Sequence, residues 1–209
     1  MITDGLNPLA VLLFIGAVLG GLALAGVYLF ARATGREPAA RISLRLLLGG
    51  VVAYVLLLIG ASVTSSNRVL APGEAKHICE IDCHLAYSLA GDKAETLADG
   101  RVRHTVTVRV VFDKETISSR RPLDAALYPN SRYVALVDAG GRTYEGSSEG
   151  LHRKLVPGES YTTDIVFEVP ADAGELRLIL RNNDAPTPFI IGHENSPFHG
   201  KTTFALPRA

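Results

Sequence analysis

The chain has 209 residues, and its 21 lysines and arginines balance its 21 aspartates and glutamates, so the formal net charge is zero. This balance argues against a nucleic-acid-binding protein, because such domains carry a basic surplus. The charges are nevertheless segregated: residues 5–63 hold four arginines, one glutamate and no lysine, and residues 64–209 hold nearly all the acids. The second part is long enough for one packed core and short for two.

Two uncharged apolar stretches mark the N-terminal part of the chain. The first runs from Leu9 to Ala31 and the second from Leu46 to Val63. A helix needs about 20 such residues to cross the hydrocarbon core of a bilayer. In lipid, a helix satisfies every backbone polar group within its own segment. We therefore predict transmembrane helices over residues 9–31 and 46–63, both in contact with the lipid bilayer.

The charges that flank these stretches predict their orientation. The segment 32–45 carries four arginines, whereas the tail 1–8 carries no lysine or arginine. The positive-inside rule then places 32–45 in the cytoplasm and both termini on the periplasmic or extracellular side. This predicts a two-pass protein of the bacterial inner membrane. Ala23-Leu24-Ala25 resembles a signal-peptidase site, but the tail before it lacks the positive charge of a signal peptide.

Small residues recur in both apolar stretches and allow helices to approach closely. They are Gly16, Gly20, Gly21 and Gly26 in the first stretch and Gly49, Gly50 and Gly60 in the second. Two interpretations follow: the two helices pack on each other, or they present a surface to a partner subunit. We favour the first on the sequence alone, and both can hold together.

The remainder of the chain has the pattern of an all-β domain. Residues 64–74 are polar and contain Pro72-Gly73, which predicts a linker to a domain over 75–209. Residues 101–112 alternate between apolar and polar side chains with the period of a half-buried strand. Further strands are expected near Cys79 and over 132–139, 142–145, 161–169, 175–180 and 201–206, with a hairpin turn at Gly140-Gly141. About seven strands separated by Gly, Pro and Asn turns predict an immunoglobulin-like sandwich.

Three short stretches of this domain resemble a known family. Residues 155–160 (LVPGES) lead into 165–170 (IVFEVP) and then into the leucine-rich strand at 176–178 (LRL). Over about residues 100–206 the chain resembles a widespread bacterial family of immunoglobulin-like domains from lipoproteins and membrane-anchored proteins. The resemblance implies an immunoglobulin-like fold that serves binding or scaffolding rather than catalysis, although a fold alone does not determine a function.

The only two cysteines, Cys79 and Cys83, lie in the run from His77 to His84 and allow three interpretations. If one strand continues through the run, both cysteines face the core as small apolar residues. An oxidising compartment favours instead a Cys79–Cys83 disulfide. That bond requires a turn, because four residues of extended chain span about 13 Å whereas a disulfide joins Cα atoms about 5–6 Å apart.

The third interpretation is a metal site, since thiolate and imidazole ligands suit copper or zinc. The candidate ligands are Cys79, Cys83, His77, His84, His193 and His199. The two C-terminal histidines join the set if the first and last strands are neighbours. The Cys-x3-Cys spacing resembles the dinuclear copper domain of cytochrome oxidase subunit two and the copper chaperones of its assembly. The chain departs from that motif, because Tyr87 stands where the motif has histidine and Met1 is the only methionine.

No catalytic motif is present: the sequence lacks a nucleophile elbow, a His-Glu-x-x-His helix and a phosphate-binding loop. We therefore expect a non-catalytic accessory subunit without a cofactor, whose external β-sandwich docks on or stabilises a membrane protein complex. The membrane protein complex that we consider is a respiratory or photosynthetic electron-transfer assembly. The alternative function is a copper-handling or redox domain that uses the His-x-Cys-x3-Cys-His cluster.

Overall fold

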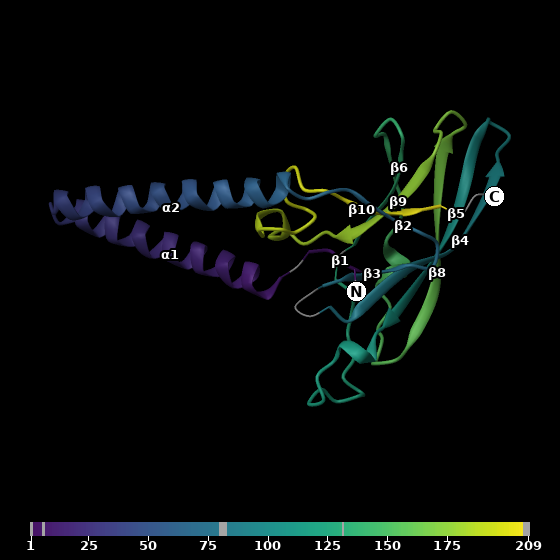
Figure 1. Ribbon diagram of the computed structural model, residues 1–209, viewed down its shortest axis with the longest axis horizontal. Helices are drawn as coiled ribbons and strands as arrows, with labels where there is room; N and C mark the ends of the chain where they lie inside the picture. The colour runs from purple at the N-terminus through teal and green to yellow at the C-terminus, as the bar shows by residue number, and fades with distance from the viewer. Residues whose placement is uncertain (1, 6, 80–82, 131, 207–209) are drawn as a thin grey trace. The chain divides into compact units, whose positions relative to one another are not determined.

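The computed structural model describes residues 2–5, 7–79, 83–130 and 132–206. The chain divides into two compact units (Figure 1). The β unit comprises residues 1–4, 67–185 and 201–209, and the helical unit comprises residues 5–66 and 186–200. The segment 186–200 therefore groups with the N-terminal helices and not with the strands that flank it in the sequence, which the sequence pattern did not predict.

The helical unit is built on two long helices, α1 (Pro8–Ala33) and α2 (Glu37–Val63), which Figure 1 shows as a pair joined by a short turn. The Asn7 side chain caps α1 by accepting a hydrogen bond from the Leu9 amide at 2.9 Å, and Pro8 occupies the first helical position. At the turn, Arg32 forms an ion pair with Glu37 at 2.6 Å. Both helices are long and apolar enough to cross a membrane, with a mean hydropathy of 2.5 over their most apolar windows.

Two five-stranded mixed sheets form the β unit. One has the strand order β1 (Ile2–Thr3), β3 (Ala75–Ile78), β4 (Leu85–Thr96), β5 (Arg101–Phe112) and β8 (Ser160–Pro170). The other has the order β2 (Arg68–Leu70), β10 (Thr202–Ala205), β9 (Leu176–Asn182), β6 (Arg132–Asp138) and β7 (Thr143–Glu145). The β1–β3 and β2–β10 pairs are parallel, and the other pairs are antiparallel. Short 3-10 helices are η1 (Lys114–Thr116), η2 (Glu149–Leu151) and η3 (Thr187–Phe189).

The strand predicted over 101–112 is confirmed with the same bounds as β5. The predicted number of about seven strands is wrong, because the described part of the chain contains ten. β1 and β2 are only two and three residues long and lie in the expected tail and linker, so they were too short for an alternating pattern. They form because each pairs with a strand that is distant in the sequence.

The two sheets share one apolar core, as in a β-sandwich. On β5 the side chains of Val106, Val108, Val110 and Phe112 are at most 1% exposed. They belong to one buried cluster with residues of β6 and β9 from the other sheet, among them Leu136 and Leu178. Each such side chain contributes about 1.5–3 kcal/mol by leaving water. The opposite face of β5 is polar: Arg101 and Arg103 form ion pairs with Glu168 of β8 at 2.6 and 2.7 Å.

The predicted hairpin turn is confirmed between β6 and β7, where Val137 pairs with Thr143. Gly141 adopts a φ of 82°, which a residue with a side chain rarely adopts. Asp138 closes the turn: its carboxylate accepts hydrogen bonds from the Arg142 amide at 2.9 Å, the Arg142 Nε at 2.6 Å and the Tyr144 hydroxyl at 3.2 Å. A side chain that is only 1% exposed thus finds three donors.

This arrangement predicts a pH dependence of stability. Burial alone would raise the pKa of Asp138, but the hydrogen bonds from Arg142 and Tyr144 outweigh it and hold the pKa below its ordinary value of 3.8. A lowered pKa in the folded state stabilises the fold above the unfolded pKa, and this contribution is lost as the pH falls through the folded pKa. The range from about pH 5 to about pH 2 brackets a carboxyl pKa. Over this range, the free energy of unfolding measured in urea should fall more for the wild type than for Asp138→Asn.

The matched control for this prediction is Asp172→Asn, whose carboxylate is 74% exposed and meets Arg142 only at 3.5 Å. It should keep the acid dependence of the wild type. An Asp138→Asn variant whose free energy of unfolding falls as steeply with acid as that of the wild type would contradict the prediction.

Candidate functional site

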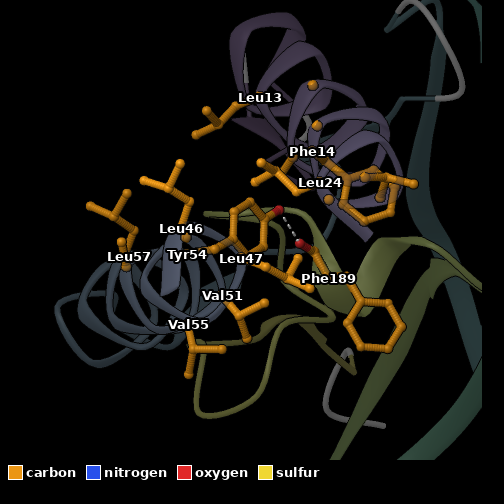
Figure 2. Close-up of a pocket in the computed structure, with 17 residues that line it drawn as sticks. Leu13, Phe14, Leu24, Leu46, Leu47, Val51, Tyr54, Val55, Leu57 and Phe189 are labelled. Carbon is orange, nitrogen blue, oxygen red and sulfur yellow. Dashed lines mark hydrogen bonds between the residues drawn. The ribbon is translucent and has the colours of Figure 1, made fainter. Parts of the chain in front are cut away.

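An apolar cleft runs between α1 and α2 within the helical unit and has a volume of about 530 Å³. Its lining on α1 extends from Leu13 to Leu24 and on α2 from Leu46 to Leu57, and Phe189 of η3 completes it (Figure 2). Eleven residues of helix rise about 16 Å, so the cleft is elongated along both helices. Its shape and lining suit an apolar ligand that extends along the helix axes.

The glycines of the cleft face open space. A Cβ atom built on Gly16, Gly20 or Gly50 would meet no other atom within 4 Å. Only at Gly21 would a Cβ reach the facing helix, at 3.8 Å from Leu47 Cδ1. Because 3.8 Å is an ordinary van der Waals distance, none of the glycines that line the cleft is required for the approach of the two helices, contrary to the favoured expectation.

The hydroxyl of Tyr54 is the polar group that projects into the cleft. Figure 2 shows Tyr54 extending from α2 into the space between the helices, where its hydroxyl donates a hydrogen bond to the Phe189 carbonyl at 2.7 Å. The bond satisfies both groups, so the cleft stays apolar in character. No sequence motif marks Tyr54, and the one local signal for it is that it is the only aromatic residue in the stretch 46–63.

The 186–200 segment is held by hydrogen bonds among its own residues. The Ile190 carbonyl accepts from the His193 amide at 3.1 Å and from the Ser196 hydroxyl at 2.7 Å, and Asn195 donates to the Thr187 hydroxyl at 2.8 Å. The His193 Nδ1 accepts from the Asn195 amide at 3.0 Å.

The segment also contacts the end of α2, where the Gly200 amide donates a hydrogen bond to the Ser65 hydroxyl, just after the helix, at 2.6 Å. The segment is therefore a compact structure that contacts α2.

The two cysteines form a disulfide, Cys79–Cys83, with Cα atoms 4.0 Å apart. Strand β3 ends at Ile78 and β4 begins at Leu85, so the alternation expected for one continuous strand is interrupted here. Cys79 is fully buried and Cys83 is half-buried. The interpretation of both cysteines as core residues of one strand required the two side chains to be buried alike. Residues 80–82 of the intervening run lie outside the described part of the chain.

The buried end of the disulfide is tied to both sheets of the β unit. The Cys79 amide donates to the Asp4 carboxylate at 3.1 Å, just after β1. The Cys79 carbonyl accepts from the Asn182 side chain of β9 at 3.5 Å. These contacts fix Cys79, one end of the disulfide, within the β unit.

The candidate metal ligands are distributed between the two units. His77 lies 3.1 Å from the Asp113 carboxylate, and His84 lies 2.7 Å from the Thr116 hydroxyl and stacks on Phe112. His193 and His199 belong to the helical unit, where the His199 Nδ1 meets the Gly200 carbonyl at 2.7 Å. Among the described residues, no three His, Cys, Asp or Glu side chains gather in a way that could hold a metal ion. The metal site stays a prediction for the reduced cysteines.

His104 of β5 lies at the edge of the core, with a side chain that is largely buried. Its Nδ1 lies 3.0 Å from the Asp92 carboxylate of β4, and the two side chains are 13% and 6% exposed. The sequence pattern did not predict Asp92 as the partner. A buried carboxylate and a buried imidazole at this distance satisfy each other's hydrogen-bonding groups, which is a structural role.

Comparisons with protein-family models, curated proteins and solved structures found no match to this chain. The resemblance to bacterial immunoglobulin-like domains therefore stays a prediction. The cleft in the helical unit and the disulfide in the β unit are the structural features that bear on function.

Proposed function

We propose that this chain is a non-catalytic, membrane-anchored interaction subunit, which accepts an apolar transmembrane helix of a partner membrane protein in the cleft between α1 and α2. The observation that carries the proposal is the open space beside Gly16, Gly20 and Gly50. Each of these glycines lines the cleft, so a partner can approach the helix backbone there.

Helices associate in lipid through close packing, because lipid tails are as apolar as the side chains that they would replace. Small residues four positions apart on one face, such as Gly16 and Gly20, allow this approach. The length of the cleft along α1 and α2 fits the side chains of a helix that runs beside them. A second copy of this chain and a lipid acyl chain are the competing occupants.

The proposed topology places the arginine-rich turn region in the cytoplasm and both termini on the periplasmic or extracellular side of a bacterial inner membrane. The arginines of residues 32–45 support it through the positive-inside rule. The Cys79–Cys83 disulfide supports it as well, since such bonds persist in oxidising compartments. In this arrangement the β unit, proposed to be immunoglobulin-like, contacts the external part of the same complex.

A photo-reactive amino acid at Ala17 tests the proposal. Ala17 lines the cleft, whereas Leu19 is 62% exposed and does not line it, so Leu19 is the matched control position. After illumination of native membranes, the probe at Ala17 should give one discrete adduct with a second membrane protein, and the probe at Leu19 should give no such adduct. Adducts at Ala17 with lipid alone, or with a second copy of this chain alone, would overturn the proposal.

A further inference from the structure

The 186–200 segment carries two phenylalanines with exposed side chains. Phe189 is 58% exposed and Phe198 is 77% exposed. Both belong to the unit that contains α1 and α2. Phenylalanine is one of the apolar residues with which interfacial elements insert into the boundary between headgroups and acyl chains.

Contacts with α2 set the depth of the segment relative to that helix. The Gly200 amide bonds to Ser65, which follows the end of α2, whereas the Phe189 carbonyl bonds to Tyr54. Tyr54 precedes Val63, the last residue of α2, by nine residues, and nine residues of helix rise about 14 Å. The segment therefore extends from the end of α2 to within reach of a side chain that begins nine residues earlier, so Phe189 lies deeper along α2 than Gly200 and its neighbour Phe198.

Irregular backbone at membrane depth requires partners within the protein, because lipid offers no hydrogen bonds. The 186–200 segment meets this requirement at the positions that lie deepest. The Phe189 carbonyl accepts from Tyr54, the Thr187 carbonyl accepts from the Ile190 amide at 3.2 Å, and the Ile190 carbonyl accepts two hydrogen bonds. These bonds leave the carbonyls of Thr187, Phe189 and Ile190 satisfied within the protein.

The backbone of Phe198 adopts an unusual conformation. Phe198 has a φ of 64°, the only positive φ of a non-glycine residue in the described part of the chain. Bulky side chains rarely adopt this conformation, and such outliers often mark functional positions. Here it presents a large apolar ring outward at a place where a glycine or an asparagine would fit the backbone better.

We propose that the 186–200 segment is a lipid-contacting element of the outer leaflet, with Phe189 among the acyl chains and Phe198 at the level of the headgroups. The inference rests on the proposed membrane span of α1 and α2. Phe189 also lines the cleft, so only the part of its ring that faces away from the partner helix is assigned to the acyl chains. It assigns the segment a bilayer ligand: the aromatic rings bury apolar surface in the interface and position the segment at a defined depth.

Tryptophan fluorescence tests this proposal, because the chain contains no tryptophan. The full-length variants Phe189→Trp, Phe198→Trp and Leu19→Trp are reconstituted in phosphatidylcholine vesicles that carry a spin label either near the headgroup or deep in the acyl chain. Phe198→Trp should be quenched several-fold more by the shallow label than by the deep one. Phe189→Trp should show relatively stronger quenching by the deep label, and both should resist aqueous iodide.

Leu19→Trp reports on the span, since Leu19 is exposed near the middle of α1. If Leu19→Trp is quenched by lipid labels while both phenylalanine positions are quenched by iodide and not by lipid, the lipid-contacting role is overturned and the span stands. If Leu19→Trp itself is quenched by iodide and not by lipid, the span fails and the present inference fails with it. A far-ultraviolet circular dichroism spectrum like that of the wild type shows that each variant is folded.

Discussion

Replacing Gly20 by leucine should displace the partner helix and leave the two-helix unit folded. Gly20 lines the cleft, and a Cβ built on it meets no atom of this chain within 4 Å. The leucine therefore finds room in the isolated chain but occupies the space proposed for the partner. Overpacking of this kind costs about 1–3 kcal/mol, which corresponds to a loss of affinity of roughly fivefold to 150-fold. Co-purification of the partner from membranes in mild detergent measures the effect.

Matched controls separate occupation of the cleft from a general effect of leucine in a helix. Gly26 of α1 has equally open surroundings but does not line the cleft, so Gly26→Leu should retain the partner. On α2 the corresponding pair is Gly50→Leu, in the cleft, and Gly49→Leu, outside it. Equal recovery of the partner with all four variants would contradict the assignment of the cleft. Loss with all four would point to impaired insertion of the helices.

Removing the disulfide with Cys79→Ser/Cys83→Ser should lower the free energy of unfolding of the β unit by about 2 kcal/mol, the chain-entropy value for so short a loop. Two contacts of Cys79, with Asp4 and Asn182, lie next to the bond and should loosen with it. Urea unfolding of the full-length chain in detergent, followed by circular dichroism, gives the measurement. The wild type treated with a reductant should unfold like the double variant and so serves as the control.

The same preparation decides among the three interpretations of the cysteines. The disulfide predicts no free thiol in the untreated wild type, even after denaturation. Two thiols that react only on denaturation would indicate buried, unbonded cysteines. Stoichiometric copper or zinc in the wild type, lost in the double variant, would indicate a metal site and make His77 and His84 the next residues to replace.

Local patterns in the sequence were sufficient where one element determines its own structure. The strand over 101–112 could be predicted because alternate valines and Phe112 must all face one side of a strand. The turn at Gly140-Gly141 could be predicted because Gly141 supplies the positive φ that the hairpin requires. The two apolar helices followed from length and hydropathy alone. Each of these features depends on residues that are close together in the sequence.

The tertiary structure decided the features that depend on distant residues. β1 and β2 are too short to be recognised and exist only through pairing with β3 and β10. The disulfide depends on where β3 ends, which the alternation near Cys79 did not predict. The grouping of the 186–200 segment with the helices depends on hydrogen bonds such as that between Tyr54 and Phe189, 135 residues apart.

The sequence by itself thus determined the class of this protein: two apolar helices, then a β-rich region with one core. Only the tertiary structure decided where a ligand could bind, since the glycines of both helices looked alike in the sequence. Their surroundings differ because contacts, and not residue type, determine whether a glycine faces the neighbouring helix, as Gly21 faces Leu47, or faces open space, as Gly20 does. Hydropathy and periodicity are local properties, whereas an open surface exists only after the whole chain has packed.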